Sequence, residues 1–338
     1  MKAMVLAAGF GTRLRPLTQR LPKPMFPLFG RPVVEHLLRH LGRQGLSEVT
    51  LNLHHLPDPI LNHFGDGRSL GLTLHYSHEQ AILGTAGGIL AARRYLEDGP
   101  FWVVNSDILI DLDFRRVLRF HQEKASALTL VLYDGEATGI HDPIELDAGG
   151  RVVHMVGASS RNLPEVSSRV TFTGVQLVEP ALFDRIPAGR FCGTTSDVYP
   201  RMVEEGEPVY GFRHTGYWQD MGTLAQYLQV HRDVLDGRFH LPDALPSSPA
   251  PGGQIVEPVW IGPGCAIAPD ARVGPYAVLY EGCRIEAGAE VANSVCWRGA
   301  VAGERCRVRH SVLGEGARVA PGTLVEQEAR VPPADSTP

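Results

Sequence analysis

The chain has 338 residues, of which 43% are hydrophobic and 20% are charged, and its formal net charge is −5. This composition excludes a largely disordered chain, and the acidic balance argues against a broad nucleic-acid-binding face. No apolar run approaches the roughly 18 residues of a transmembrane helix. The five cysteines are odd in number and lack CxxC spacing, so we expect a reduced cytoplasmic protein without a disulfide or zinc scaffold.

Residues 1–237 alternate strand-like and helix-like segments. In chain order we predict a strand at 2–7, a helix at 32–43, a strand at 48–53, a helix at 85–96, a strand at 101–104, a helix at 112–121 and a strand at 127–133. Residues 144–178 are rich in strand signals, and helices near 179–186 and 223–236 complete the unit. This rhythm predicts an α/β fold with a Rossmann-like, mostly parallel sheet that is interrupted by an antiparallel insert.

Residues 238–254 are rich in Pro, Gly and Ser and are interpreted as a linker. From 255 to 330 aliphatic residues recur every six positions, and small residues often follow four positions later, which predicts a parallel β-helix. The repeat resembles the left-handed hexapeptide family, and residues 331–338 form a tail. The predicted inward residues are Ile255, Ile261, Ile267, Val273, Leu279, Ile285 and Val291 and, after a slip of four, Val295, Val301, Leu313, Val319 and Val325, with Arg307 as the one poor fit.

Two glycines and two cations follow the first predicted strand. Gly9 and Gly11 allow close backbone approach to a ligand, and successive N–H groups there can bind an anion. Arg13 adds a planar cationic fork and Lys23 a point charge, so residues 9–24 are typical of a triphosphate cradle. There is no third glycine at the dinucleotide-fold spacing and no GK[ST], which excludes an NAD fingerprint and a Walker P-loop. The alternative is a glycine turn followed by a basic surface loop.

Residues 9–24 resemble the G-x-G-T-R-L-x-P-x-T-x3-P-K-P signature of the sugar-1-phosphate nucleotidylyltransferases. Four further segments are similar to motifs of that family: 83–88 to L-G-T-A-G, 103–107 to V-N-G-D with Ser106 in place of the usual glycine, 172–175 to F-T-G-I, and 217–223 to Y-W-x-D-x-G-T. The resemblance covers nearly the whole chain, because several members also carry a C-terminal hexapeptide β-helix.

The resemblance implies an Mg²⁺-dependent transfer of a nucleotidyl group from a nucleoside triphosphate to a sugar 1-phosphate. Such reactions depend on in-line positioning and on neutralised charge. The implied metal ligands are Asp107 and Asp220, and Arg13, Lys23 and Asp107 are the implied catalytic residues. The implied nucleotide-binding residues are Ala7, Ala8, Gly9, Gly11, Thr12, Arg13, Glu79, Gly84 and Thr85. The implied sugar-binding residues are Asn105, Gly174 and Asp220.

The resemblance also bears on the base and the sugar. Glu79 lies where some members place a base-reading glutamine, and a carboxylate could accept hydrogen bonds from guanine, which favours GTP and mannose 1-phosphate. UDP- or dTDP-sugar synthesis is the alternative. Many members carry a Glu-Lys pair after the insert strand, but residues 151–158 contain neither, so a non-catalytic subunit that senses nucleotide sugars also stays open.

Three groups of histidines are given non-catalytic interpretations. His36 and His40 are spaced for a metal but are interpreted as part of a solvated helix face, and His54 with His55 as loop residues. His310 lies in the β-helix, where no acyl-CoA feature accompanies it, so an acyltransferase is disfavoured. We expect the β-helix to serve assembly of a homo-oligomer and not chemistry.

Overall fold

The computed structural model describes residues 1–134, 143–160, 165–249 and 252–333. Residues 250–251 of the predicted linker and 334–338 of the predicted tail lie outside this range. Contacts divide the chain into two compact units, one formed by Met1–Gly9 with Leu37–Gln219 and the other by Phe10–His36 with Asp220–Pro338. Each unit combines two segments that are distant in the sequence. The units therefore do not test the domain boundaries at 237, 254 and 330, which remain a prediction.

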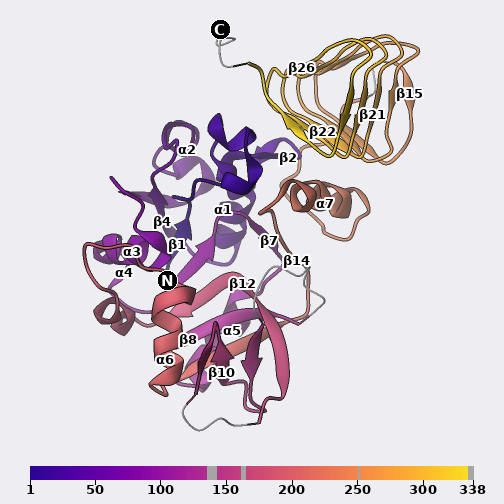
Figure 1. The fold of residues 1–338 in the computed structure, drawn as a ribbon. Helices are drawn as coiled ribbons and strands as arrows, with labels where there is room; N and C mark the ends of the chain where they lie inside the picture. The colour runs from indigo at the N-terminus through magenta and orange to yellow at the C-terminus, as the bar shows by residue number, and fades with distance from the viewer. Residues whose placement is uncertain (135–142, 161–164, 250–251, 334–338) are drawn as a thin grey trace. The chain divides into compact units, whose positions relative to one another are not determined.

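The first unit is built on a mixed sheet. Its parallel part has the order β6 (Phe101–Asn105), β1 (Lys2–Leu6), β4 (Glu48–Leu53) and β5 (Thr73–His78). Nearly every residue of β1, β4 and β6 is buried, as expected for strands covered on both faces. The helices α3 (Gly84–Ala91) and α4 (Arg93–Leu96) pack against β1. The predicted fold class is confirmed (Figure 1).

The antiparallel part of this sheet is organised by one long strand, β12 (Ser168–Val178). Its carboxyl-terminal half pairs antiparallel with β6 and with β8 (Leu128–Tyr133) in the buried centre of the sheet. Its amino-terminal half pairs with β9 (Ile144–Leu146), and β10 (Val152–Met155) and β11 (Ala158–Ser159) follow outward. The expected insert therefore consists of β9–β11 and half of β12.

Several predicted elements differ in the structure. The helix predicted at 85–96 is divided at Ala92 into α3 and α4, and the segment Pro180–Arg185 is a 3-10 helix. The helix α5 (Phe114–Glu123) begins later than expected because Asp113 caps its first turn. Among the described residues, none of the helices has the length and apolar character that a bilayer span requires. The elements that were not predicted include α2 (Asp58–Phe64), β5, α6 (Tyr199–Glu204) and β13 (Val209–His214), of which β13 pairs with β8.

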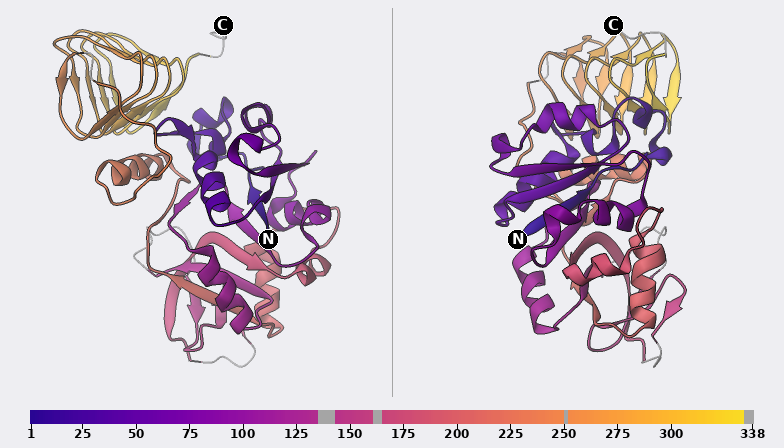
Figure 2. Two further views of the ribbon diagram at one scale, coloured as in Figure 1. Left: turned by 180° about the vertical axis from the view of Figure 1, so that it is seen from behind. Right: turned by 90° about the vertical axis from the view of Figure 1, so that its left-hand side faces the viewer.

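The second unit contains α7 (Leu224–Leu235) and a parallel β-helix from β15 (Gln254–Ile255) to β28 (Ala329–Arg330). Its short strands form three parallel sheets, and the stacked coils are visible in Figure 2. Aliphatic residues point into the coil and stack on the equivalent residues of the next coil, which confirms the β-helix that the hexads predict.

The predicted phase of the hexads is wrong at Val295 and Val301, whereas Leu313, Val319 and Val325 lie in the core as predicted. Leu279 pairs with Cys296 and then Leu313, so Cys296 and not Val295 is the inward residue. Likewise Ala302 replaces Val301 in the core. Val308 pairs with Val291, which explains why Arg307 fits the pattern poorly. Each later coil is one residue shorter than the earlier coils, and the small inward side chains hide this change from a search for aliphatic residues.

Candidate functional site

The carboxyl ends of three parallel strands meet at one edge of the sheet in the first unit. Leu6 pairs with Asn52 of β4 and with Asn105 of β6, so Ala7 follows directly between two asparagines. The backbone N–H of Ala7 donates to Oδ1 of Asn52 at 2.8 Å. Ligands of open α/β sheets bind at such an edge. Asn52 was not predicted, although its place near the carboxyl end of a predicted strand is a signal that could have found it.

Glu79 extends this hydrogen-bond network toward α3. Its side chain is buried, and the residue is only 6% exposed. Its Oε1 accepts from Nδ2 of Asn52 at 2.7 Å, and its Oε2 accepts from the backbone N–H of Leu83 at 2.9 Å. A carboxylate offers about four lone-pair positions. Glu79 therefore fixes the segment before α3 and still has acceptor capacity for a ligand.

Gly84 and Thr85 at the start of α3 are held by a neighbouring loop. Gly84 adopts φ +76°, and a β-carbon there would lie 2.5 Å from the carbonyl oxygen of Cys192. The hydroxyl of Thr85 accepts from the backbone N–H of Thr194 at 2.7 Å. Glycine is therefore required at 84 for close packing, and the Thr85 side chain already binds protein.

Asn105 and Gly174, both predicted to bind the sugar, lie against each other. Gly174 has φ +84°, and a β-carbon there would lie 2.5 Å from Nδ2 of Asn105. Trp218 supports the same place, because its indole N–H donates to the carbonyl oxygen of Thr173 at 2.9 Å. The motifs at 172–175 and 217–223 thus meet in the structure, and Trp218 is a further residue that sequence reasoning did not assign.

In the second unit, Gly11 shapes the predicted phosphate loop. It has φ +59°, and a β-carbon would lie 2.8 Å from the methyl group of Thr18 and 3.5 Å from Cβ of Lys23. The Thr18 hydroxyl donates to the carbonyl oxygen of Gly11 at 3.0 Å. Only glycine fits this turn without strain. The turn brings Gly11 and Lys23 together, as the signature predicts.

Arg13 lies against the motif that contains Asp220. A β-carbon at Gly222 would lie 2.7 Å from an Nη atom of Arg13, so the guanidinium occupies the space above this glycine. The backbone N–H of Gly222 donates to Oδ1 of Asp220 at 3.1 Å. Thr223 then caps α7 by accepting from the backbone N–H of Gln226. Arg13 is exposed, and within the described part of the chain it forms no ion pair, which leaves its donors available to an anion.

The two predicted metal ligands belong to different units, with Asp107 in the first and Asp220 in the second. Asp107 lies two residues after the end of β6, and both aspartates are half-buried. Within residues 1–134, 143–160, 165–249 and 252–333, no group of three or more His, Cys, Asp or Glu could hold an ion. Each aspartate supplies a carboxylate, which is a ligand type that Mg²⁺ takes, with water and phosphate completing the shell of the ion.

The stretch that replaces the family's Glu-Lys pair does not supply a free cation. Arg151 donates from its guanidinium to the carbonyl oxygens of Gly206 and Glu207. His154, three residues further along the chain, binds the hydroxyl of Ser159 at 2.9 Å. Both side chains therefore have structural partners inside the first unit.

The histidines have the structural roles expected of them, with one correction. His36 does not lie on a solvated face, because it is 3% exposed and its Nε2 binds the carbonyl oxygen of Leu28 at 2.8 Å. His40 binds the carbonyl oxygen of Leu112, and His54 that of Glu79. These rings therefore fix backbone segments.

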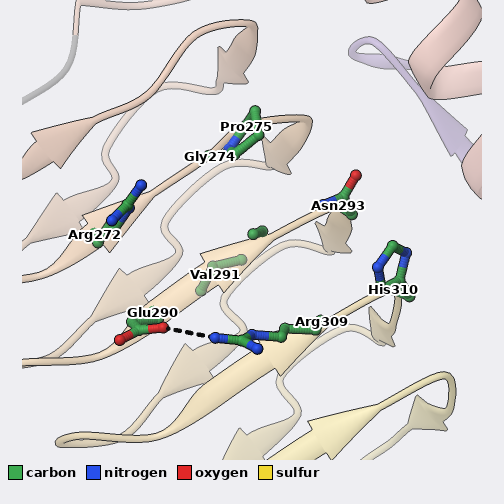
Figure 3. Close-up of a pocket in the computed structure, with 9 residues that line it drawn as sticks. Arg272, Gly274, Pro275, Glu290, Val291, Asn293, Arg309 and His310 are labelled. Atoms are coloured by element: carbon green, nitrogen blue, oxygen red, sulfur yellow. Dashed lines mark hydrogen bonds and ion pairs between the residues drawn. The ribbon is translucent and has the colours of Figure 1, made fainter.

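His310 lines a cavity of about 360 Å³ on the surface of the β-helix (Figure 3). Arg272, Glu290 and Arg309 line the same cavity, and Glu290 accepts from Arg309 at 3.2 Å. Positive and negative side chains alternate on successive coils here, as on an ordinary solvated face. Glu290, the carboxylate that shares this cavity with His310, is already paired with Arg309, so the cavity gives no support to acyl transfer.

Two family models match this chain. Residues 2–237 match the family described as nucleotidyl transferase, and residues 255–331 match the GMPPB C-terminal domain. A mannose-1-phosphate guanylyltransferase of Mycobacterium tuberculosis is 33% identical over 85% of this chain and 81% of its own length. A UTP–glucose-1-phosphate uridylyltransferase of Synechocystis is 30% identical over 94% of this chain and 86% of its own length.

A solved structure, HddC from Yersinia pseudotuberculosis complexed with GMP-PN, resembles the chain with a TM-score of 0.58. It is 22% identical in sequence and covers 68% of this chain and 96% of its own. At this identity the likeness concerns the fold alone.

Proposed function

The chain belongs to the nucleotidyl transferase family, and we propose that it transfers a guanylyl group from GTP to mannose 1-phosphate, giving GDP-mannose and pyrophosphate. A phosphate oxygen of the sugar phosphate attacks the α-phosphorus of the triphosphate, the new P–O bond forms, and the bond to the β-phosphate oxygen breaks. Charge accumulates on the leaving pyrophosphate, so the site must supply donors and cations in fixed positions.

The residues of the second unit supply those cations. Arg13 presents a planar set of donors, and Lys23 a compact charge beside the Gly11 turn. The observation that carries the proposal is the packing of Arg13 on Gly222, because it joins the phosphate loop to the motif of Asp220 within one compact unit. A basic surface loop, which is the alternative interpretation of residues 9–24, would not require Arg13 to pack on Gly222.

Substrate recognition is assigned to residues of the first unit. Ala7, Asn52 and Glu79 form one hydrogen-bonded network, and Glu79 retains acceptor positions for the N–H groups of guanine. Asn105 and Gly174 would contact the sugar, where the absence of a side chain at 174 leaves room for it.

Asp107 and Asp220 would hold a divalent cation, which we propose is Mg²⁺. When bound, the ion neutralises charge on the α-phosphate and orients it. The role of the two aspartates is to present carboxylate oxygens, and the N–H bond from Gly222 orients one oxygen of Asp220.

The test is pyrophosphate release measured across a matrix of GTP, UTP, dTTP and ATP with several sugar 1-phosphates. We expect the highest kcat/KM with GTP and mannose 1-phosphate. UTP with glucose 1-phosphate is the main alternative, because one relative carries that name. Release with neither pair would contradict the proposed enzyme.

A sensor subunit without turnover is the second candidate. The observation that favours it concerns Arg151, whose guanidinium donates to the carbonyl oxygens of Gly206 and Glu207. Arg151 therefore does not replace the cation of the missing Glu-Lys pair. Calorimetric binding of a nucleotide sugar without pyrophosphate release in either direction would support the sensor and exclude the enzyme.

We also propose that the protein acts in the cytoplasm as a homo-oligomer assembled through the β-helix. All five cysteines are free thiols, in keeping with a reducing compartment. The open ends of a stacked coil need covering, which favours self-association. Light scattering that gives a mass of 36.8 kDa would show a monomer and contradict the assembly.

A further inference from the structure

The segment that carries Lys23 continues directly into a buried contact with the β-helix. The 3-10 helix Lys23–Met25 is closed by a bond from the backbone N–H of Phe26 to the carbonyl oxygen of Lys23 at 3.0 Å. Phe26 is 1% exposed, and its ring meets the edges of Trp297 and Tyr227 at centroid distances of 4.7 and 5.5 Å. These residues all belong to the second unit, where β2 (Pro27–Leu28) lies beside the coils of the β-helix (Figure 1).

A chain of hydrogen bonds reinforces this contact. The indole N–H of Trp297 donates to the hydroxyl oxygen of Tyr227 at 3.1 Å, and the Tyr227 hydroxyl binds the carbonyl oxygen of Pro27 at 2.5 Å. An indole N–H can only donate and a carbonyl can only accept, so the direction of the chain is fixed. Trp297 on the β-helix is thus connected through Tyr227 on α7 to the backbone next to Phe26.

A second chain holds the other end of the segment. The backbone N–H of Phe29 donates to the hydroxyl oxygen of Tyr280 at 2.9 Å, and this hydroxyl lies 3.1 Å from Nε2 of His231. Nδ1 of His231 lies 2.9 Å from the carbonyl oxygen of Tyr227, which can only accept. Nδ1 therefore carries the proton, and Nε2 accepts from Tyr280. Buried networks in which every member has a partner are rigid.

We propose that Trp297 and Tyr280 are positioning residues for Lys23, so that the β-helix contributes to catalysis by fixing the backbone that carries this lysine. The inference rests on the proposed function, in which Lys23 stabilises charge on the leaving pyrophosphate. Lys23 is connected to the held segment by the Phe26–Lys23 bond, and its Cβ lies close to Gly11 of the phosphate loop. A backbone fixed on both sides of Phe26 keeps the ammonium group in place, and small displacements of such a group are costly for rate.

The test uses Tyr280→Phe, which removes only the hydroxyl and keeps the ring, and Trp297→Phe, which removes the indole N–H and leaves a smaller aromatic ring against Phe26. Tyr276→Phe is the matched control, because its hydroxyl binds Asp236 and not the segment 26–29. We expect kcat for pyrophosphate release to fall about tenfold in Trp297→Phe and Tyr280→Phe, with the KM for the triphosphate changed less than about twofold. The control should keep its kcat.

The decisive measurement repeats both substitutions in a Lys23→Ala background. If the two residues act through Lys23, neither substitution should lower kcat further, because a double-mutant cycle then shows full coupling. Equal losses in both backgrounds, or an unchanged kcat in the Lys23 protein, would overturn the inference. A wild-type protein that releases no pyrophosphate would overturn the proposed function and the inference together, whereas additive losses in an active enzyme overturn the inference alone.

Discussion

Lowering the pH should destabilise the second unit through His231. Burial lowers the pKa of this imidazole to about 4, against an ordinary value of 6.5. Between these values the unfolded chain binds a proton that the folded chain excludes, so stability is full above pH 6.5 and is lost as the pH falls toward 4. Linkage gives a loss of about 2 kcal/mol from His231 at pH 5 relative to pH 8.

The structural reason is that Nε2 of His231 already accepts a hydrogen bond from the hydroxyl of Tyr280. A proton on Nε2 would face the hydroxyl of Tyr280, which would then have to accept from both His231 and the backbone N–H of Phe29 and could no longer donate to the ring. The hydroxyl of Tyr227, the nearest other titratable group, stays neutral because burial raises its pKa. The charged ring would thus be enclosed without a compensating carboxylate in this cluster.

The assay is urea unfolding at pH 8 and pH 5, followed by tryptophan fluorescence, in the wild type and in His231→Gln. The variant cannot titrate here, so it should lose about 2 kcal/mol less than the wild type between the two pH values. Burial also lowers the pKa of His36, but this residue is present in both proteins and cancels in the comparison. Equal losses in the two proteins would refute the reasoning.

Three further outcomes are expected. Asp107→Asn and Asp220→Asn should each lower kcat by at least about a hundredfold while circular dichroism stays unchanged, because each removes a carboxylate charge from the proposed metal site. Arg13→Ala and Lys23→Ala should lower kcat more than they raise the KM for GTP, since the charge they face develops in the transition state; a change in KM alone would show ground-state binding. Ending the chain at Gly237 should lower the melting temperature of the remaining protein, because Trp297 and Tyr280 no longer cover the segment around Phe26.

Patterns that depend on neighbouring residues were predictable from the sequence. The parallel strands at 2–7, 48–53 and 101–104 were found because they are short apolar runs that are buried on both faces. Gly11 and Gly174 were found because their motifs are local, and the structure gives both the positive φ that only glycine adopts easily.

Features that depend on pairing across the chain were not predictable in this way. β5 and β13 have mixed polarity because each lies at an end of the sheet, so neither stands out as an apolar run. Glu79 also binds Asn52, which lies 27 residues earlier on strand β4, and no spacing in the sequence connects the two. The length of the later coils was predicted wrongly because the inward residues Cys296 and Ala302 are small. Their neighbours Val295 and Val301 are aliphatic and were therefore assigned to the inward positions.

The division of the chain into units also changes how the signature loop is understood. The sequence places Lys23 in a segment that follows the first strand of the sheet, and it assigns the β-helix only to assembly. The contacts place the same lysine in a unit with the β-helix, because Phe26 and Phe29 are held there by rings and hydroxyl groups that come from more than 200 residues away in the chain. A domain without acid–base chemistry can therefore influence a reaction, because transition-state charge is stabilised only as well as the backbone beneath the cation is fixed.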